Sequence, residues 1–438
     1  MLERKIQTFI NEHFKSNSNK VLVIDGARQI GKSYIIRFVC GELFKNYIEI
    51  NLLEDSLGEK LFEHTKSVED FYLQISMLAG NKMGTKEDTV IFLDEIQVYP
   101  HLLTLLKFLQ QDGRFTYIAS GSLLGVTLIQ TTSIPIGSIE VKRMYALDFE
   151  EFLWANNIGK EAIKGLRQKF LSREGLTDNI HNKMMDLFKK YLIAGGLPDV
   201  VNTYLETKNV MRVRHLQTEI QHYYALDASK YETNNRLKIR KIYEMIPSNL
   251  ENKKKRVIVK SIENKIGKRY SDYEEEFEYL IHSGIALEVR AISNPAFPLI
   301  ESSNKNLLKL YLNDVGLLTN ILYKNNIRPI MDNETSVNLG SVYECVVASE
   351  LKAHGKNLFY YDNKKRGEVD FLVDDYDTLS VVPIEVKSGK DYSVHRALNS
   401  FISVEDYGIQ TAYVISNEKN VSVKNKITYI PVYYTMFL

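Results

Sequence analysis

Cysteine is nearly absent from this sequence. Among its 438 residues only Cys40 and Cys345 occur, far apart and without the spacing of metal ligands. Because zinc sites and disulfide frameworks need several cysteines at short, regular spacings, neither is expected here. The scarcity of cysteine fits a protein of the reducing cytosol.

Long apolar runs and an excess of charge of one sign are also missing. No stretch approaches the roughly 20 apolar residues that span a bilayer, and the N-terminus opens on an amphipathic pattern rather than the apolar core of a signal peptide. The formal net charge of +1 gives no general attraction to nucleic acids or membranes, so any basic surface must be local. We therefore expect a soluble, cytoplasmic protein with no membrane partner.

A phosphate-binding loop is the most informative motif that is present. It lies between an apolar strand pattern at 21–24 and a helical pattern at 34–40, the order typical of nucleotide-binding P-loops. Glycines let the backbone approach a polyphosphate, whose charge meets N–H groups at the helix N-terminus. Lys32 would reach the β- and γ-phosphates, and Ser33 would hold Mg²⁺. The predicted nucleotide-binding residues are Gly26, Ala27, Arg28, Gln29, Ile30, Gly31, Lys32 and Ser33.

A second motif follows at a spacing compatible with one domain. Residues 89–95 resemble a buried strand that ends in Asp94 and Glu95. Asp94 at the end of a strand suits Mg²⁺, and Glu95 is placed to polarise the attacking water. An ordinary charged strand end is the alternative. The P-loop upstream favours a site for ATP or GTP.

The first 155 residues alternate between strand and helix patterns. Such alternation indicates a parallel sheet covered on both faces, with nucleotide at the carboxyl ends of its strands. Further strands are expected at 47–52 and 115–120, and helices at 2–14 and 102–110. The strand at 115–120 ends in Ser120-Gly121-Ser122, where a hydroxyl could sense the γ-phosphate. A turn of small residues explains the same pattern.

The centre of the sequence has a helical pattern followed by a winged-helix pattern. Apolar residues recur at helical spacing over 156–235, and three helices then precede two short strands at 286–292 and 307–312. Basic residues cluster here and could serve phosphate backbones, although a solvated charged face explains them as well. They are Lys253, Lys254, Lys255, Arg256, Lys260, Lys265, Lys268 and Arg269. The predicted domains are 1–155, 156–235, 236–330 and 331–438.

The C-terminal region brings three charged residues into one pattern. Glu385 and Lys387 are two apart on a strand and share a face, and Asp370 on the neighbouring strand could lie beside Glu385. Two carboxylates and a lysine suit a Mg²⁺ site with a cation that orients or deprotonates a water nucleophile. Glu344, on the preceding helix, is the expected accessory ligand. A strand with two solvent-facing charges is the alternative, but the order αβββαβ favours a metal-nuclease fold.

Six motifs in order resemble a large prokaryotic family of AAA-type ATP-binding proteins, over nearly the whole chain. They are the P-loop, Leu93–Gln97, Ala119–Ser122, Leu147–Phe152, Gly195–Pro198 and Tyr311–Leu317. The resemblance implies an α/β protein with three parts: an AAA-type P-loop sheet, a central helical and winged-helix region, and a C-terminal domain like the PD-(D/E)xK restriction endonucleases. It also implies ATP and Mg²⁺ as cofactors, hydrolysis supported by Asp94 and Glu95, and a sensor role for Ser120 or Ser122.

One departure from the family concerns an arginine. The Gly-Arg that usually follows the sensor strand is replaced here by Gly137-Ser138. If that arginine contacts phosphate, Arg143 or a residue from a neighbouring subunit of a homo-oligomer must replace it. An arginine at the γ-phosphate contributes about 10³–10⁵ in rate, so hydrolysis without one would be slow.

The preferred hypothesis is an ATPase whose nucleotide state controls a metal-dependent nuclease acting on DNA. The predicted catalytic residues are Glu95, Ser120, Asp370, Glu385 and Lys387, and the predicted metal ligands are Ser33, Asp94, Glu344, Asp370 and Glu385. A second hypothesis is a nucleotide-switched regulatory protein whose nuclease-like domain docks a partner without cutting. Widely separated carboxylates, or a Lys387 held in a salt bridge, would favour it. A third is an ATP-driven motor that acts on DNA through the winged helix.

Overall fold

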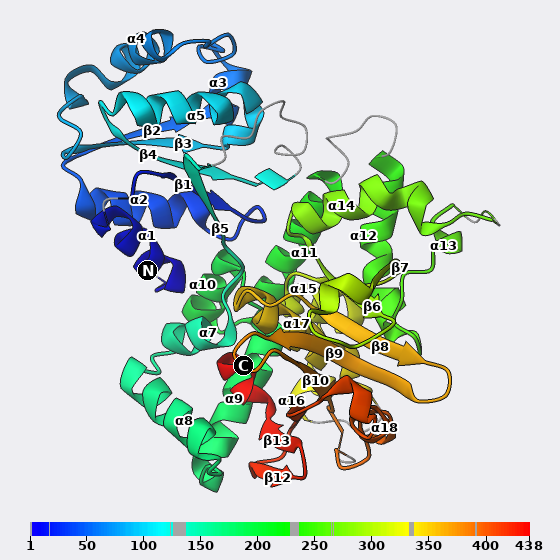
Figure 1. Cartoon of the computed structure of the whole chain (residues 1–438). Helices are drawn as coiled ribbons and strands as arrows, with labels where there is room; N and C mark the ends of the chain where they lie inside the picture. The colour runs from blue at the N-terminus through cyan, green and yellow to red at the C-terminus, as the bar shows by residue number, and fades with distance from the viewer. Residues whose placement is uncertain are drawn as a thin grey trace. The chain divides into compact units, whose positions relative to one another are not determined.

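The chain folds into two units, each with its own sheet (Figure 1). The computed structural model describes residues 2–16, 18–122, 124–125, 137–227, 236–263, 265, 267–332, 337–389 and 392–438. The first unit comprises Glu3–Tyr145 with His282–Gly284, and the second comprises Ala146–Ile281 with Ile285–Leu438. In the described ranges, no helix combines the length and apolarity needed to cross a membrane.

The first unit contains a five-stranded parallel sheet with strand order β2-β3-β4-β1-β5, which confirms the predicted parallel α/β architecture. Helices α3, α4 and α5 cover one face of this sheet, and α1 and α2 cover the other (Figure 1). Alternate strand residues such as Val23 and Leu93 pack with α4 and α5 in one core. The elements are α1 (Lys5–Lys15), β1 (Val21–Asp25), α2 (Lys32–Leu43), β2 (Asn46–Asn51), α3 (Leu52–Leu57), α4 (Val68–Ala79), β3 (Thr89–Asp94), α5 (Pro100–Asp112), β4 (Thr116–Gly121) and β5 (Ile139–Arg143).

The second unit begins with helices. They are α7 (Phe149–Ala155), α8 (Lys160–Ser172), α9 (Asp178–Ala194), α10 (Pro198–Thr207), α11 (Val210–Asp227), α12 (Arg236–Glu251), α13 (Lys260–Glu263) and α14 (Glu274–His282), the last of which ends in the first unit. The helical pattern predicted for 156–235 is therefore present up to Asp227, and residues 228–235 lie outside the described residues.

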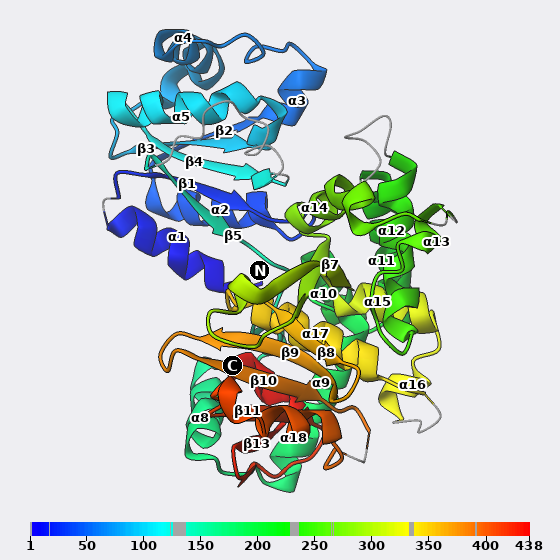
Figure 2. The same cartoon turned by 45° about the vertical axis from the view of Figure 1, so that its right-hand side comes forward.

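An eight-stranded sheet completes the second unit. Its strand order is β12-β13-β11-β10-β9-β8-β6-β7. Helices α17 and α18 lie on opposite sides of its central strands (Figures 1 and 2). The elements are β6 (Ala286–Ile292), β7 (Ser303–Leu312), α15 (Val315–Tyr323), α16 (Arg328–Met331), α17 (Gly340–Ala353), β8 (Phe359–Asn363), β9 (Gly367–Asp375), β10 (Ser380–Val386), α18 (Arg396–Ile402), β11 (Ala412–Ser416), β12 (Ser422–Lys424) and β13 (Ile427–Pro431). The predicted helix–strand order after 331 is present, although α18 is shorter than expected.

The hairpin that we expected in a winged-helix module belongs to this larger sheet. Strands β6 and β7 pair antiparallel, but β6 also pairs in parallel with β8 at Arg290–Ile292. The physical reason is that the second edge of β6 carries backbone donors and acceptors that need partners, and β8 supplies them. The three domain boundaries drawn from the sequence stay predictions, while the contacts gather 146–281 and 285–438 into one unit.

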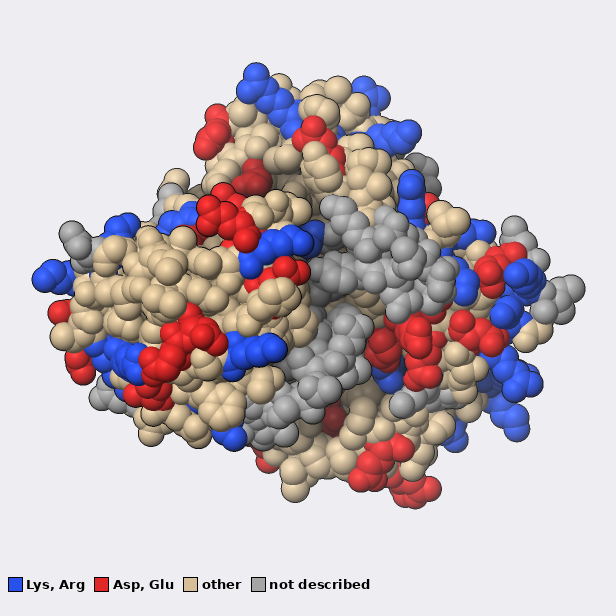
Figure 3. All heavy atoms as spheres, turned by 90° about the horizontal axis from the view of Figure 1, so that it is seen from above, with Lys and Arg blue, Asp and Glu red and all other residues tan. Residues whose placement is uncertain are grey.

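Charges of both signs are mixed on the face of the protein that Figure 3 presents. Figure 3 shows basic and acidic side chains interspersed over the face that it presents, without one large patch of either sign. This distribution agrees with the net charge of +1.

Three of the family-like motifs meet inside the second unit. The Asp314 carboxylate accepts hydrogen bonds from the Gly196 N–H at 2.6 Å and the Leu317 N–H at 2.9 Å. The Gly196 carbonyl in turn accepts from the Leu147 N–H at 2.7 Å. Residues from three motifs therefore form one buried hydrogen-bonded junction. The Leu147 backbone lies so close to Gly196 that this position has no room for a side chain.

We expect Gly196→Ala to lower the free energy of unfolding by about 2–3 kcal/mol, because overpacking forces the backbone to shift. A Cβ at this position would lie 2.0 Å from the Leu147 carbonyl oxygen. Urea unfolding measures the effect. Gly165→Ala is the matched control: a Cβ at Gly165, in α8, meets nothing within 4 Å, so that change should stabilise the helix slightly. Equal midpoints for wild type and Gly196→Ala would contradict the expectation.

Candidate functional site

The predicted P-loop forms a sharp turn between β1 and α2. Gly26 has a φ of 148°, and a Cβ on it would lie 2.3 Å from the Met144 carbonyl oxygen. Gly31, at a φ of 90°, is the N-cap of α2, which begins at Lys32. Strand, loop and helix follow in the order that the sequence predicts. The first N–H groups of α2 have no partners within the helix and are available to an anion.

The Lys32 ammonium lies inside this loop. It is buried and donates hydrogen bonds to the carbonyl oxygens of Gly26 at 2.9 Å and Ala27 at 2.7 Å. Burial lowers the pKa of Lys32, and the carboxylates of Glu95, Asp25 and Asp94 oppose that shift. The loop therefore holds a cation where a polyphosphate would need one.

Asp94 is the point where three elements converge. The Ser33 hydroxyl, from α2, donates to one carboxylate oxygen of Asp94 at 2.7 Å, and the Ser120 hydroxyl, from β4, donates to the other. Strand β4 lies between β1 and β3 in the sheet, so the ends of all three strands meet here. Burial raises the pKa of Asp94, although both hydroxyls lower it. The structure thus brings together residues up to 87 positions apart in the sequence.

Glu95 is held by the residues around Ser122. It adopts a left-handed backbone conformation at φ 57°, which is uncommon for a non-glycine residue. Its carboxylate accepts hydrogen bonds from the Ser122 hydroxyl at 3.0 Å and from the Gln97 side-chain amide. Arg28 of the P-loop also donates to the Ser122 hydroxyl, at 3.4 Å. Ser120 and Ser122 therefore contact different carboxylates. Gln97 ends the motif Leu93–Gln97, but the sequence analysis did not single it out as a site residue.

Arg143 lies at the end of β5, beside the start of the P-loop. The register pairs it with Asp25, and the guanidinium Nε is 3.9 Å from the Asp25 carboxylate. Burial raises the pKa of Asp25, and the charges of Arg143 and Lys32 lower it. Arg143, one of the expected substitutes for the arginine of the missing Gly-Arg pair, thus lies next to Asp25, the last residue of β1.

The predicted C-terminal residues lie on neighbouring antiparallel strands. Asp370, on β9, accepts a hydrogen bond from the Val386 N–H at 2.9 Å, and the Lys387 ammonium donates to Glu385 at 2.7 Å. Asp370 is 9% exposed and Glu385 is 6% exposed. The alternative of two solvent-facing charges is therefore wrong for Glu385, whereas the Lys387 side chain keeps 28% of its surface exposed.

Glu344, on α17, joins these carboxylates together with two residues that the sequence did not single out for this site. Its side chain accepts hydrogen bonds from the Tyr311 hydroxyl at 2.8 Å and from the Lys255 ammonium. Burial and the charge of Asp370 raise the pKa of Glu344, and the same two causes raise the pKa of Glu385 to about 8. Lys255 belongs to the basic cluster that we expected on a solvated face or at phosphate backbones. Only the structure shows that it turns inward.

The chemistry of this donor set suits a divalent cation, but among the described residues the oxygens of the three carboxylates do not all lie within 4.8 Å of one another. Glu344, Asp370 and Glu385 are oxygen ligands of the kind that Mg²⁺ prefers. One oxygen of Glu385, Oε2, is buried without a hydrogen-bond partner in the described structure. A buried carboxylate oxygen without a partner carries a desolvation cost that a cation would remove. The ion pair of Lys387 with Glu385, in contrast, is the feature that we expected of a docking module.

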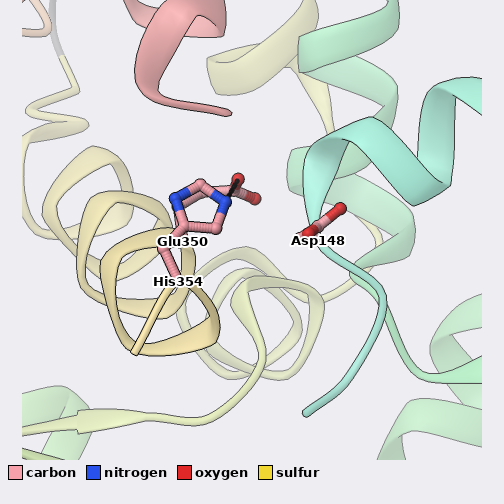
Figure 4. Close-up of side chains that lie close together, drawn as sticks. All are labelled: Asp148, Glu350 and His354. Carbon is pink, nitrogen blue, oxygen red and sulfur yellow. Dashed lines mark ion pairs between the residues drawn. The ribbon is translucent and has the colours of Figure 1, made fainter. Parts of the chain in front are cut away.

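Asp148, Glu350 and His354 form a tighter group, with candidate ligand atoms within 4.8 Å of one another (Figure 4). Their hydrogen bonds are those of a structural junction. Asp148 caps α7 by accepting from the Glu151 N–H at 2.8 Å, and Glu350 accepts from the Phe149 N–H at 2.6 Å. His354 Nδ1 lies 3.1 Å from the Leu438 carbonyl oxygen. The group ties the start of α7 to α17 and to the last residue.

Comparison with known proteins supports the N-terminal assignment. Residues 18–153 match a family model described as an AAA domain. Residues 185–327 and 339–435 match models of two domains of unknown function, DUF8612 and DUF4143. No curated protein is similar enough in sequence to count as a match.

Several solved structures are similar in part. A Walker-type ATPase of Pyrococcus abyssi has 14% identity, with 73% of this chain and 95% of that chain covered, and a TM-score of 0.45. The RuvB Holliday junction branch migration motor of Thermotoga maritima has 17% identity, 64% and 87% coverage, and a TM-score of 0.29. The ORC1 protein of Aeropyrum pernix, in complex with DNA, has 12% identity, 75% and 92% coverage, and a TM-score of 0.32. Scores at this level carry no inference about ligands or partners.

The likeness of residues 331–438 to restriction endonucleases stays a prediction, since residues 339–435 match only a domain family of unknown function. Residues 18–153 are thus similar to AAA domains, and two later regions are similar to domain families without an assigned function.

Proposed function

We propose that this protein binds ATP with Mg²⁺ at residues 26–33 and hydrolyses it. The observation that carries the proposal is the convergence of the Ser33 and Ser120 hydroxyls on the Asp94 carboxylate, beside the buried Lys32 ammonium. Bound Mg²⁺ supplies positive charge that offsets the charge on the transferred phosphoryl group. Ser33 and Asp94 would hold the ion, and Lys32 would contact the β- and γ-phosphates.

In this proposal Glu95 orients and polarises the attacking water, and Ser120 reports the γ-phosphate. Two hydrogen bonds, from Ser122 and Gln97, hold the Glu95 carboxylate in place. General-base groups of this kind contribute about 10²–10⁴ in rate. Gly137-Ser138 supplies no arginine, so we expect slow turnover unless Arg143 or a residue of a second copy reaches the γ-phosphate.

Titration calorimetry tests the binding proposal. Mg-ATP should release or absorb heat with one site per chain, and Mg-GTP should bind more weakly. An absence of heat with Mg-ATP would overturn the proposal. Measuring hydrolysis with and without DNA separates a DNA motor from the other hypotheses, because only a DNA motor requires that DNA stimulate the ATPase rate.

We further propose that Glu344, Asp370 and Glu385 form a Mg²⁺ site that cleaves DNA under control of the nucleotide state. Three buried carboxylates and the unpartnered Glu385 oxygen support a cation there. Asp370 and Glu385 would hold the ion at the scissile phosphate, and Lys387 would position the water. The competing proposal is a non-cutting docking module, which the Lys387–Glu385 ion pair supports.

We expect Lys387→Ala to lower DNA cleavage at least about 100-fold, because the group that positions the water is lost. ATP binding should be unchanged. Nicking of supercoiled DNA with Mg²⁺ or Mn²⁺, with and without ATP, measures the effect. Lys426→Ala, at an exposed lysine of the same unit, is the control and should cut normally. Wild-type protein that never nicks DNA would remove the nuclease proposal and favour docking.

A further inference from the structure

The carboxylate site contains an ammonium group from far outside the C-terminal region. Lys255 lies between α12 and α13, and its ammonium donates to one oxygen of Glu344, 89 residues away in the sequence. The Lys255 side chain keeps 20% of its surface exposed, whereas that of Glu344 keeps 3%. Lys255 thus reaches from the surface into a buried acidic site.

Both oxygens of Glu344 have partners in this arrangement. Lys255 binds Oε1, and the Tyr311 hydroxyl donates to Oε2 at 2.8 Å. A Mg²⁺ ligand must approach the ion to about 2.0–2.1 Å. An ammonium and a divalent cation at the same carboxylate oxygen would repel each other strongly in a buried site. Glu344 therefore serves as a metal ligand only after Lys255 withdraws.

We propose that Lys255 is a resident cation of the carboxylate site, which a divalent cation must displace from Glu344 in order to bind. This inference rests on the proposed metal site. Lys255 on Glu344 and Lys387 on Glu385 together lower the net charge of the three buried carboxylates when no metal is bound, and the departure of Lys255 frees Glu344. The metal-free protein is in this way protected from the cost of several uncompensated buried charges.

The two lysines that donate to carboxylates of the site, Lys255 and Lys387, differ in how freely they can leave. Lys387 directly follows β10, and its backbone N–H is bound to the Ile415 carbonyl oxygen at 2.8 Å. Lys255 lies in a segment outside helices and strands, next to the exposed residues Lys253 and Lys254. A lysine side chain on such a segment can move its ammonium into water by rotating its own flexible stem. We therefore assign the displacement to Lys255 and not to Lys387.

Calorimetric titration with Mn²⁺ tests the inference on the full chain. If the Lys255–Glu344 ion pair is formed about 90% of the time, removing it lowers the apparent Kd for the cation about tenfold. Lys255→Met keeps the stem and removes the charge, so we expect its Kd for Mn²⁺ to fall about tenfold. Lys255→Arg keeps a cation and should resemble wild type. Lys253→Met, at the exposed neighbour, is the matched control and should also resemble wild type.

A second measurement needs no variant. Acetic anhydride should modify Lys255 several-fold faster in wild-type protein with Mn²⁺ than without it, because the displaced ammonium enters water. Modification of Lys253, read from the same peptides by mass spectrometry, should not change. Unchanged Lys255 labelling despite measurable Mn²⁺ binding would overturn the inference.

The outcomes separate this inference from the proposed metal site. Equal or weaker Mn²⁺ binding by Lys255→Met, with clear binding by wild type, overturns the role of Lys255 and leaves the metal site standing. An absence of Mn²⁺ heat in both proteins overturns the metal site and the inference with it. Mg-ATP is titrated in parallel to check that each protein is folded and active in nucleotide binding.

Discussion

Lys32→Ala is expected to lower the affinity for Mg-ATP at least about 100-fold. Truncating one partner of a buried, hydrogen-bonded charge pair costs roughly 2–5 kcal/mol, and about 2.7 kcal/mol corresponds to this factor. The Lys32 ammonium is the cation that the loop encloses, and it lies among the charges of Glu95, Asp25 and Asp94. Titration calorimetry of Mg-ATP into both proteins measures the loss.

Lys45→Ala is the control for this prediction. Lys45 is an exposed lysine of the same unit, just after α2. The control variant should bind Mg-ATP as wild type does, because an exposed charge is screened by water and salt. If Lys32→Ala retained wild-type affinity while folded, residues 26–33 would not be the triphosphate site that we propose.

Glu95→Gln is expected to bind Mg-ATP normally and to hydrolyse it about 10²–10⁴ times more slowly, the usual range for removing a general base. The substitution nearly preserves shape, and the glutamine carbonyl can still accept a hydrogen bond from the Ser122 hydroxyl. The loss is therefore chemical rather than structural. Phosphate release under single-turnover conditions measures the rate, and calorimetry measures the affinity.

Glu87→Gln, at an exposed glutamate of the same unit, controls for the change in net charge and should leave both quantities unaltered. Normal hydrolysis by Glu95→Gln would show that another group polarises the water. Weak binding by Glu95→Gln would instead show that the carboxylate supports the bound nucleotide.

Local sequence patterns predicted the elements that carry the nucleotide site. Strands β1 and β3 and the loop before α2 lie where the motifs placed them. The reason is that these motifs are short and contiguous: a strand, a glycine turn and a helix start are determined by neighbouring residues. The sensor role of Ser120 stays a prediction; the structure shows that its hydroxyl donates to Asp94.

The carboxylate site could be predicted only in part. Asp370 and Glu385 lie on the adjacent strands β9 and β10, and Lys387 directly follows β10. Period-two alternation was enough to place Glu385 and Lys387 on one face. Lys255 and Tyr311 come from other elements, and their contacts with Glu344 span 89 and 33 residues. A run of basic residues gives no sign of which one turns inward. The sequence also could not predict that the hairpin of β6 and β7 joins a larger sheet. Its partner strand, β8, follows much later in the chain.

The sequence alone determined that this protein has a nucleotide-phosphate loop, an acidic strand end and a parallel α/β sheet, since each follows from the order of nearby residues. The tertiary structure decided which hydroxyl contacts which carboxylate, that Lys255 belongs to the C-terminal site, and that the predicted hairpin extends an eight-stranded sheet. These contacts depend on the packing of residues far apart in the chain. Burial of these side chains then shifts their pKa values and favours their pairing with opposite charges.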